Sequence, residues 1–254
     1  MQSIKLRLPG ADDFFTEEAY KVLRTNLQFC GQDVKVIAIT SCNENDGKST
    51  IALHVAKSFS ELGKKVLVID ADMRKSVIAG RHTSVKGPAG LSEVLSGLEQ
   101  VTECVYETQI PGLHLMFSGQ YPPNPVELLS SSRMKKALDT ARKVYDYVIL
   151  DLPPVGEVTD AMAIAKETDG ILLVVRQNYC DRNVLVDTAR QFDFINSKIL
   201  GVVFNCTSEH SGNYGKGYYK HYYKRYYKRY YRGYSKSYEN NDRSVASSVP
   251  MDKR

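Results

Sequence analysis

Short runs of apolar, mostly β-branched residues alternate along this chain with longer stretches whose apolar residues recur every three or four positions. The short runs are typical of strands buried on both faces of a sheet, and the longer stretches are typical of amphipathic helices. Their alternation indicates βαβ units, in which helices connect parallel strands. The sequence therefore predicts an α/β domain with a doubly wound, mostly parallel sheet and helices on both faces.

The predicted elements end near Cys206. Strands are expected at 34–40, 65–69, 113–117, 148–150, 171–175 and 199–205. Helices are expected at 17–29, 48–62, 90–96, 160–167 and 184–195. A further helical stretch is expected after the break at 122–125 and runs to about Arg142. Beyond Cys206 no stretch could bury a core. We therefore divide the chain into an N-terminal helical segment (1–33), a main domain (34–206) and a tail (207–254) that is predicted to be disordered.

Charge separates the tail from the rest of the chain. From Thr207 onward there are eleven Lys and Arg against four Asp and Glu, a net charge of +7, whereas the preceding 206 residues carry a net charge of −2. Only the tail therefore calls for an anionic partner. Five cysteines without Cys-x-x-Cys spacing argue against a disulfide framework or a zinc site and favour a reducing compartment. With no signal peptide or membrane-length apolar run recognised, we expect a cytoplasmic protein.

A phosphate-binding loop joins the first predicted strand to its helix. The segment 42–50 reads G-x-x-x-x-G-K-[ST] with Cys42 in place of the first glycine, and its strand–loop–helix context supports the motif. Lys48 would neutralise phosphate oxygens, Ser49 would ligate Mg²⁺, and Gly47 would let the backbone approach closely. Backbone N–H groups at a helix N-terminus would hold the triphosphate. The predicted nucleotide-contacting residues are Cys42, Asn43, Asn45, Asp46, Gly47, Lys48, Ser49 and Thr50, which makes ATP and Mg²⁺ the expected cofactors.

Three aspartates end strands at the edge where ligands bind in open α/β sheets. Asp70 and Asp72 follow the second predicted strand, and Asp151 follows the strand at 148–150. Each alone could simply cap a loop, but beside a phosphate loop the three together favour a site for Mg²⁺ and its waters. Together with the phosphate loop, they predict a P-loop NTPase-like site.

Two further residues leave alternatives open. Asn205 closes the last strand and could bind the adenine edge, or could be an ordinary turn asparagine. Cys42 lies near a helix N-terminus, which could lower the pKa of its thiol and make it redox-sensitive. The interpretation that we favour for Cys42 is a small residue tolerated at the turn.

The tail packs eleven of the 17 tyrosines into 25 residues, and eight of them form four pairs separated by basic residues. A globular core has no use for such a repeat, so the tail is either a binding surface or a substrate. The tyrosines in question are Tyr214, Tyr218, Tyr219, Tyr222, Tyr223, Tyr226, Tyr227, Tyr230, Tyr231, Tyr234 and Tyr238.

Taken together, residues 18–206 resemble the bacterial tyrosine kinases of capsular and exopolysaccharide export. In that family a phosphate loop, an Asp-x-Asp motif and an Asp-x-Pro motif form the site, and they are similar to 42–50, 70–74 and 151–153 here. The resemblance implies Lys48 on the phosphates and Ser49 and Asp72 at Mg²⁺. It also implies Asp151 at the water shell of the metal and Asp70 as the base for the tyrosine hydroxyl. The terminal tyrosine cluster implies autophosphorylation of the tail.

There are departures from the family pattern. The loop reads Glu44-Asn45-Asp46 where the family has Pro-Gly-Glu; Asn tolerates the left-handed conformation, but the two carboxylates could weaken nucleotide binding. The family's assembly motif, Glu-x-x-Arg-x-x-Arg, is similar to Glu18, Lys21 and Arg24. Lysine at position 21 cannot make the two parallel hydrogen bonds to a carboxylate that arginine makes, so it is a weaker match to the assembly motif.

The resemblance also implies partners. These are a transmembrane chain-length regulator that activates the kinase and recruits it to the inner face of the membrane, a phosphotyrosine phosphatase, and further copies of the chain in a ring such as an octamer. The cationic tail could also rest on the anionic inner leaflet.

Two other functions are compatible with parts of the sequence. A switch ATPase of the partitioning or septum-placement type shares the expected architecture, but it carries an extra lysine at the position of Asn43 and has no tyrosine tail. A nucleic-acid-binding protein would suit the basic, aromatic tail. The phosphate-loop domain makes nucleic acid the less favoured partner.

Overall fold

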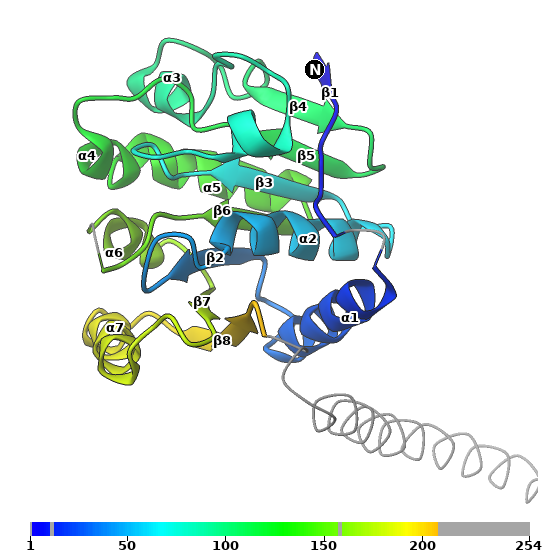
Figure 1. Cartoon of the computed structure of the whole chain (residues 1–254). Helices are drawn as coiled ribbons and strands as arrows, with labels where there is room; N and C mark the ends of the chain where they lie inside the picture. Colours follow the sequence, from blue (N-terminus) through cyan, green and yellow to red (C-terminus); the bar gives the residue numbers. More distant parts are fainter. Residues whose placement is uncertain (1, 11–12, 157–158, 208–254) are drawn as a thin grey trace, which may run out of the picture. The chain divides into compact units, whose positions relative to one another are not determined.

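The structure is a computed structural model that describes residues 2–10, 13–156 and 159–207. Among these residues, eight strands form a single sheet (Figure 1). Their bounds are β1 Gln2–Ile4, β2 Val36–Ser41, β3 Val66–Asp70, β4 Val105–Thr108, β5 Leu113–Met116, β6 Tyr147–Asp151, β7 Gly170–Arg176 and β8 Ile199–Asn205. The predicted tail lies outside the described residues, apart from Thr207.

Seven α-helices and one π-helix are found in the part of the chain that the structure describes. Their bounds are α1 Phe14–Phe29, α2 Lys48–Ser60, the π-helix η1 Ile78–His82, α3 Leu91–Ser96, α4 Pro125–Leu129, α5 Ser132–Val144, α6 Asp160–Ala165 and α7 Arg182–Phe194. Side chains cap several of them: the Asp13 carboxylate accepts from Thr16 N, and Asp181 accepts from Asn183 N. Such caps satisfy backbone N–H groups that have no partner within the helix.

The strands lie in the order β1-β4-β5-β3-β6-β2-β7-β8, and every neighbouring pair is parallel except β4 with β5. The sheet is thus mostly parallel, which confirms the predicted fold class. β2 lies between β6 and β7. The next strand in the chain, β3, lies on the β6 side of β2, whereas the later strand β7 lies on its other side. A ligand site is expected beyond the carboxyl ends of strands at such a switch point.

Helices cover both faces of the sheet (Figure 1). One buried cluster joins alternate strand residues to α3, α4, α5, α6 and α7; Phe192 of α7 belongs to it. The other cluster joins the intervening strand residues to α1, α2 and η1, with Phe59 of α2 fully buried. Because side chains alternate across a strand, a strand covered on both faces is apolar throughout, as the sequence predicts for β2 and β3.

Three elements were not predicted. β1 and β4 have only three and four residues, and each contains an exposed polar residue, so neither has the apolar run of a central strand. β1 brings the N-terminal segment into the main sheet by pairing with β4. The π-helix η1 includes Gly80, which does not favour a helix from sequence alone. Among the described residues, no helix combines the length and the apolar character that crossing a bilayer requires.

Candidate functional site

The loop between β2 and α2 has the conformation that a phosphate loop requires. Gly47 has a φ of 92°, and a Cβ there would lie 2.1 Å from the amide nitrogen of Asn205. Only glycine fits this close approach. Asn45 has a φ of 60°, so this asparagine adopts the left-handed conformation that Asn tolerates. Lys48 is the first residue of α2, so the helix N-terminus faces the cavity described below.

Asn205 holds the loop from the end of β8. Its side-chain N–H donates to the Asp46 carbonyl oxygen at 2.7 Å, and its Oδ1 accepts from Cys206 N at 2.8 Å. Both ends of the amide therefore have partners within the chain. These contacts give Asn205 a role in positioning the loop, and an adenine contact remains a prediction.

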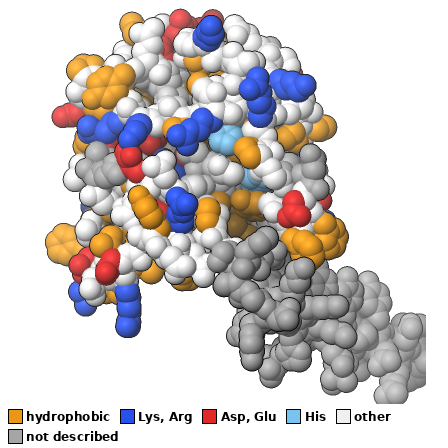
Figure 2. Space-filling model, viewed as in Figure 1, with side chains coloured by type: hydrophobic (Ala, Val, Ile, Leu, Met, Phe, Trp, Pro, Cys, Tyr) orange, Lys and Arg blue, Asp and Glu red, His pale blue; other side chains and the backbone are white. Residues whose placement is uncertain are grey.

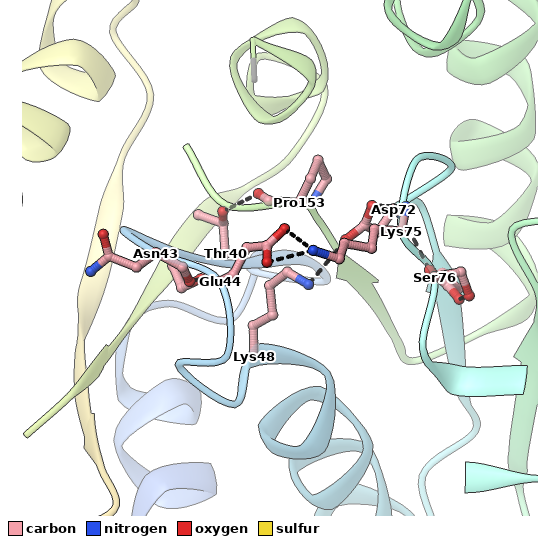
Figure 3. Close-up of polar contacts among 10 residues, drawn as sticks. Thr40, Asn43, Glu44, Lys48, Asp72, Lys75, Ser76 and Pro153 are labelled. Carbon is pink, nitrogen blue, oxygen red and sulfur yellow. Dashed lines mark hydrogen bonds and ion pairs between the residues drawn. The ribbon is translucent and has the colours of Figure 1, made fainter. Parts of the chain in front are cut away.

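Lys48 lies among carboxylates. Its Nζ donates to Asp72 Oδ2 at 3.1 Å, and both side chains are largely buried. Burial by itself lowers the pKa of Lys48, but the negative charges of Asp151, Asp72 and Asp70 outweigh it, so the pKa is raised. Figure 3 shows Lys48 extending from the start of α2 toward Asp72. The lysine is therefore fully charged at neutral pH and available to an anion.

Asp70 and Asp151 end neighbouring strands and are paired in register across β3 and β6. Both side chains are buried. Burial raises the pKa of Asp151 to about 6, opposed by Lys48 and by a hydrogen bond from Ser49. Burial, reinforced by Asp151, raises the pKa of Asp70 well above its ordinary value. Among the described residues, Asp151 Oδ1 has no hydrogen-bond partner. A buried carboxylate oxygen of this kind fits a site for a cation or its water.

A cavity of about 610 Å³ opens at this edge of the sheet. It is lined by Pro9, Glu44, Asn45, Gly47, Lys48, Ser49, Thr50, Asp72, Arg74, Lys75, Val77, Arg81, His82, Pro153 and Pro154. Figure 2 shows Lys and Arg side chains spread over the face in view, with Asp and Glu side chains among them. The cationic lining suits an anionic ligand, and the volume is in the range of small-molecule sites.

The predicted catalytic residues differ in their access to this cavity. Asp72 lines it, whereas Asp70 and Asp151 lie behind the lining. Asp70 Oδ1 accepts from Asp72 N at 3.2 Å, and its Oδ2 accepts from Ser76 Oγ. Both oxygens of the predicted base therefore already accept a hydrogen bond, so a substrate hydroxyl must share an oxygen with one of these donors or replace it.

No group of three or more His, Cys, Asp or Glu side chains within the described ranges could hold a metal ion by itself. Mg²⁺ does not need such a group, since it is usually bound by one or two carboxylates together with phosphates and waters. Ser49, Asp72 and Asp151 all lie beside Lys48 and could supply such a partial set.

The two acidic residues of the loop are disposed differently. Asp46 is fully buried, where its Oδ2 accepts from Asn43 N at 3.1 Å; burial raises its pKa. It does not line the cavity. Glu44 does, and its carboxylate pairs with Lys75. Of the two, only Glu44 can contact a phosphate in the cavity directly.

Arg74 is a residue whose role the sequence did not reveal. Its guanidinium makes two hydrogen bonds, at 2.9 and 3.1 Å, to the fully buried carboxylate of Asp160 at the start of α6. The pair joins the loop after β3 to α6. Asp160 comes just before an apolar helical stretch. From the sequence alone, a carboxylate at that position can be recognised only as a possible helix N-cap.

The pKa of Cys42 does not fit redox sensitivity. Its side chain is buried, and burial raises the pKa of the thiol to about 12. The suggested lowering of this pKa is therefore wrong, because the thiol lies in the apolar cluster beneath the loop and not at the helix N-terminus. The favoured interpretation, a small residue at a turn, agrees with this burial.

The candidate assembly residues of α1 have partners within the chain. Lys21 Nζ donates to Glu18 Oε1 at 2.7 Å, and an Arg24 NH1 hydrogen bond reaches the Ser58 carbonyl oxygen of α2 at 2.6 Å. Tyr20 stacks on His54 of α2, and Leu27 is buried, as expected for a helix that packs on the body. Assembly through this helix remains a prediction. The eleven predicted acceptor tyrosines lie outside the described residues.

Known proteins are similar to this chain over most of its length. A family model described as an AAA domain matches residues 34–199. The tyrosine-protein kinase CpsD of Streptococcus agalactiae is 40% identical over 200 residues, which are 79% of this chain and 86% of that protein. The kinase domain of the Escherichia coli tyrosine kinase ETK superposes with a TM-score of 0.75 at 28% identity, covering 82% of this chain and 83% of that one.

The fold is shared with a structure of lower sequence identity. The septum site-determining protein MinD of Pyrococcus horikoshii, a complex with Mg-ADP, has a TM-score of 0.56 at 21% identity and covers 69% of this chain and 72% of that one. At that identity the likeness concerns the fold alone. The CpsD and ETK matches are stronger and extend over most of both chains. This chain belongs to the bacterial tyrosine kinases of capsular and exopolysaccharide export.

Proposed function

We propose that this kinase uses ATP with Mg²⁺ in the cavity around Lys48 and transfers the terminal phosphate to the tyrosines of its own tail. The observation that carries the proposal is Lys48 at the N-terminus of α2, charged and paired with Asp72 where the cavity opens. A lysine so placed neutralises phosphate oxygens while the helix N-terminus offers N–H donors. The Mg-ADP in MinD supports a nucleotide on this fold.

The remaining residues are proposed to act as follows. Gly47 and the loop backbone hold the phosphates, and Asn205 keeps the loop in place through Asp46. Ser49, Asp72 and Asp151 hold Mg²⁺ or its waters, and the metal when bound offsets the charge of the phosphates. The buried Asp151 oxygen without a partner would then gain one.

Asp70 is the proposed base for the tyrosine hydroxyl. A phenol has a pKa near ~10, so a base is useful at neutral pH. The raised pKa of Asp70 brings it closer to that of an effective base, although its oxygens are engaged by Ser76 and by Asp72 N. We infer that the hydroxyl of the acceptor replaces the Ser76 contact.

The tail is proposed to be the main substrate because its repeat keeps some tyrosine within reach at high effective concentration. Each phosphate adds about −1.5 to −2 charges, so roughly four phosphotyrosines would cancel the net charge of +7. A change of partner or subunit contacts is expected near that occupancy. Native mass spectrometry of stepwise phosphorylated protein tests this, and an oligomeric state that is constant up to full occupancy would refute it.

The proposed partners follow from family membership. They are a transmembrane chain-length regulator that recruits the kinase to the inner face of the cell membrane, a phosphotyrosine phosphatase, and further copies of the chain in a ring. Glu18, Lys21 and Arg24 would contribute to the ring only if the contacts of Arg24 with α2 rearrange or are shared.

The test is to incubate the purified full chain with Mg²⁺-ATP and to measure phosphotyrosine by blotting and mass spectrometry. Lys48→Met and a chain ending at Cys206 should both lose the signal, whereas Arg190→Met, which removes a surface ion pair of α7, should keep it. Signal in the Lys48 variant would reject the assigned site. ATP hydrolysis without phosphotyrosine would favour the switch ATPase, although Asn43 replaces its extra lysine.

A further inference from the structure

An ion pair joins the two loops that border the cavity. Lys75, in the loop after β3, places its ammonium 2.5 Å from both carboxylate oxygens of Glu44 in the phosphate loop. Both residues line the cavity. Figure 3 shows the two side chains pointing toward each other, beside the contact between Lys48 and Asp72. An acidic residue here is unexpected, because the loop is built to receive an anion.

The pair is exposed enough to be exchanged. The side chain of Lys75 is 68% exposed and that of Glu44 is 31% exposed. Ion pairs in such surroundings contribute little to stability, since water competes for both charges. A more highly charged anion entering the cavity would therefore compete effectively for the ammonium of Lys75.

The backbone places Lys75 near the phosphates that Lys48 would hold. Lys75 N donates to Asp72 Oδ1 at 3.0 Å, and the other oxygen of that carboxylate accepts from Lys48 Nζ at 3.1 Å. One aspartate thus anchors both lysines. The lysine stem is long and flexible, so its ammonium can turn from Glu44 toward a ligand without movement of the loop.

We propose that Lys75 is a second phosphate-binding cation of this site and that Glu44 pairs with it until a nucleoside triphosphate enters. On entry, the ammonium exchanges the carboxylate of Glu44 for oxygens of the terminal phosphate. This inference rests on the proposed nucleotide site. Glu44 then opposes binding in two ways, by its own charge and by competing for Lys75.

A different role for the pair would be a clasp that merely holds the two loops together. The two roles predict different directions for the change in nucleotide affinity when each residue is replaced. If the pair is a clasp, Glu44→Gln and Lys75→Met both break it and change nucleotide affinity in the same direction. If Lys75 binds phosphate, removing Glu44 strengthens binding and removing Lys75 weakens it.

The experiment is calorimetric titration of the full chain with Mg²⁺-ATP analogue and with Mg²⁺-ADP. Glu44→Gln should bind the ATP analogue about tenfold more tightly than the unmodified chain, and Lys75→Met about tenfold more weakly. Lys75→Met should also weaken binding in the Glu44→Gln background, and its effect should be smaller with ADP. Lys75→Arg should restore most of the affinity. Asp187→Asn and Arg190→Met, which break a surface pair of α7, serve as matched controls.

Several outcomes would overturn the inference. Effects of equal sign in the two single variants would make the pair a clasp, and an unchanged affinity after Lys75→Met in the Glu44→Gln background would remove Lys75 from the phosphate site. Either result leaves the proposed function intact provided that Lys48→Met still abolishes binding. Absence of nucleotide binding in the unmodified chain would overturn both proposals.

Discussion

At the amino ends of the central strands, Asp169 accepts hydrogen bonds from Lys35 N at 2.8 Å and Val36 N at 2.7 Å, and its two oxygens also pair with Arg142. At the carboxyl ends, Asp151 is buried with one oxygen that has no partner among the described residues. Both aspartates adjoin parallel strands of the same sheet. They differ in whether the chain supplies all their partners.

The pKa values follow this difference. Burial opposes ionisation at both positions, but Arg142 and the backbone N–H groups hold the pKa of Asp169 below its ordinary value. Burial raises the pKa of Asp151 to about 6, because Lys48 and Ser49 only partly compensate for it. A carboxylate with complete partners stabilises the fold, whereas one with incomplete partners is expected at a site that a ligand completes.

The largest expected difference concerns activity. Asp151→Asn removes a charge from the proposed Mg²⁺ site and should lower tyrosine phosphorylation about 10²- to 10³-fold. Asp169→Asn should leave the rate within about twofold, provided that the assay temperature lies well below unfolding. Initial rates of phosphotyrosine formation measure both. Equal losses in the two variants would mean that the two ends do not differ in function.

For the free energy of unfolding, we expect the larger loss at Asp169. Asp169→Ala removes the carboxylate that accepts from Arg142 and from two backbone N–H groups, while Arg142 keeps its bond to the Glu167 carbonyl oxygen. The loss should lower the free energy of unfolding by about 2–3 kcal/mol. Urea unfolding followed by circular dichroism measures this value. A loss below about 0.5 kcal/mol would show that solvent replaces these contacts and that Asp169 is not needed for the fold.

The pH dependence separates the two ends further. Because the pKa of Asp151 is higher in the folded than in the unfolded chain, its contribution to stability is lost as pH rises from about 4 to about 6. The stability of Asp151→Asn relative to the unmodified chain should therefore increase by about 2 kcal/mol over this interval. A difference that stays constant with pH would mean that Asp151 titrates normally.

For Asp169 the sign is reversed. Its lowered pKa contributes stability that is present above the unfolded pKa of 3.8 and is lost only as pH falls below that value. The stability difference between the unmodified chain and Asp169→Ala should therefore be constant within about 0.5 kcal/mol from pH 5 to pH 8. Thermal unfolding across this range is the measurement. If this stability difference changed with pH as strongly as that expected for Asp151→Asn, the two aspartates would not differ in the way that we propose.

Most of the fold was predictable because the central strands are buried on both faces. β3 and β7 fall within one residue of the predicted ranges, since uninterrupted apolar runs leave little choice. β1 and β4 were missed because such short strands depend on their pairing partners. Pairing over long sequence distances leaves no local signal in a single sequence.

The site was predictable where chain order alone positions a residue. Lys48 follows the loop glycine at the start of the helix, and Asp70 and Asp151 were expected at the same sheet edge because both end strands. That β3 and β6 are neighbours, which brings the two aspartates together, is a finding of the structure. The contacts of Glu44 with Lys75 and of Arg74 with Asp160 depend on how loops fold back over the sheet edge. The spacing of residues along the chain does not predict such contacts. Of these residues, Glu44 was singled out from the sequence, as a departure from the family's loop pattern.

The central claim is that the carboxyl end of the sheet is completed by a magnesium nucleotide. The most direct measurement is calorimetric titration of the purified full chain with a non-hydrolysable ATP analogue, with and without Mg²⁺. The account predicts binding that requires Mg²⁺ and that is weakened at least about 100-fold by Lys48→Met but not by Asp169→Asn. Equal affinity with and without Mg²⁺, or undiminished binding by the Lys48 variant, would contradict it.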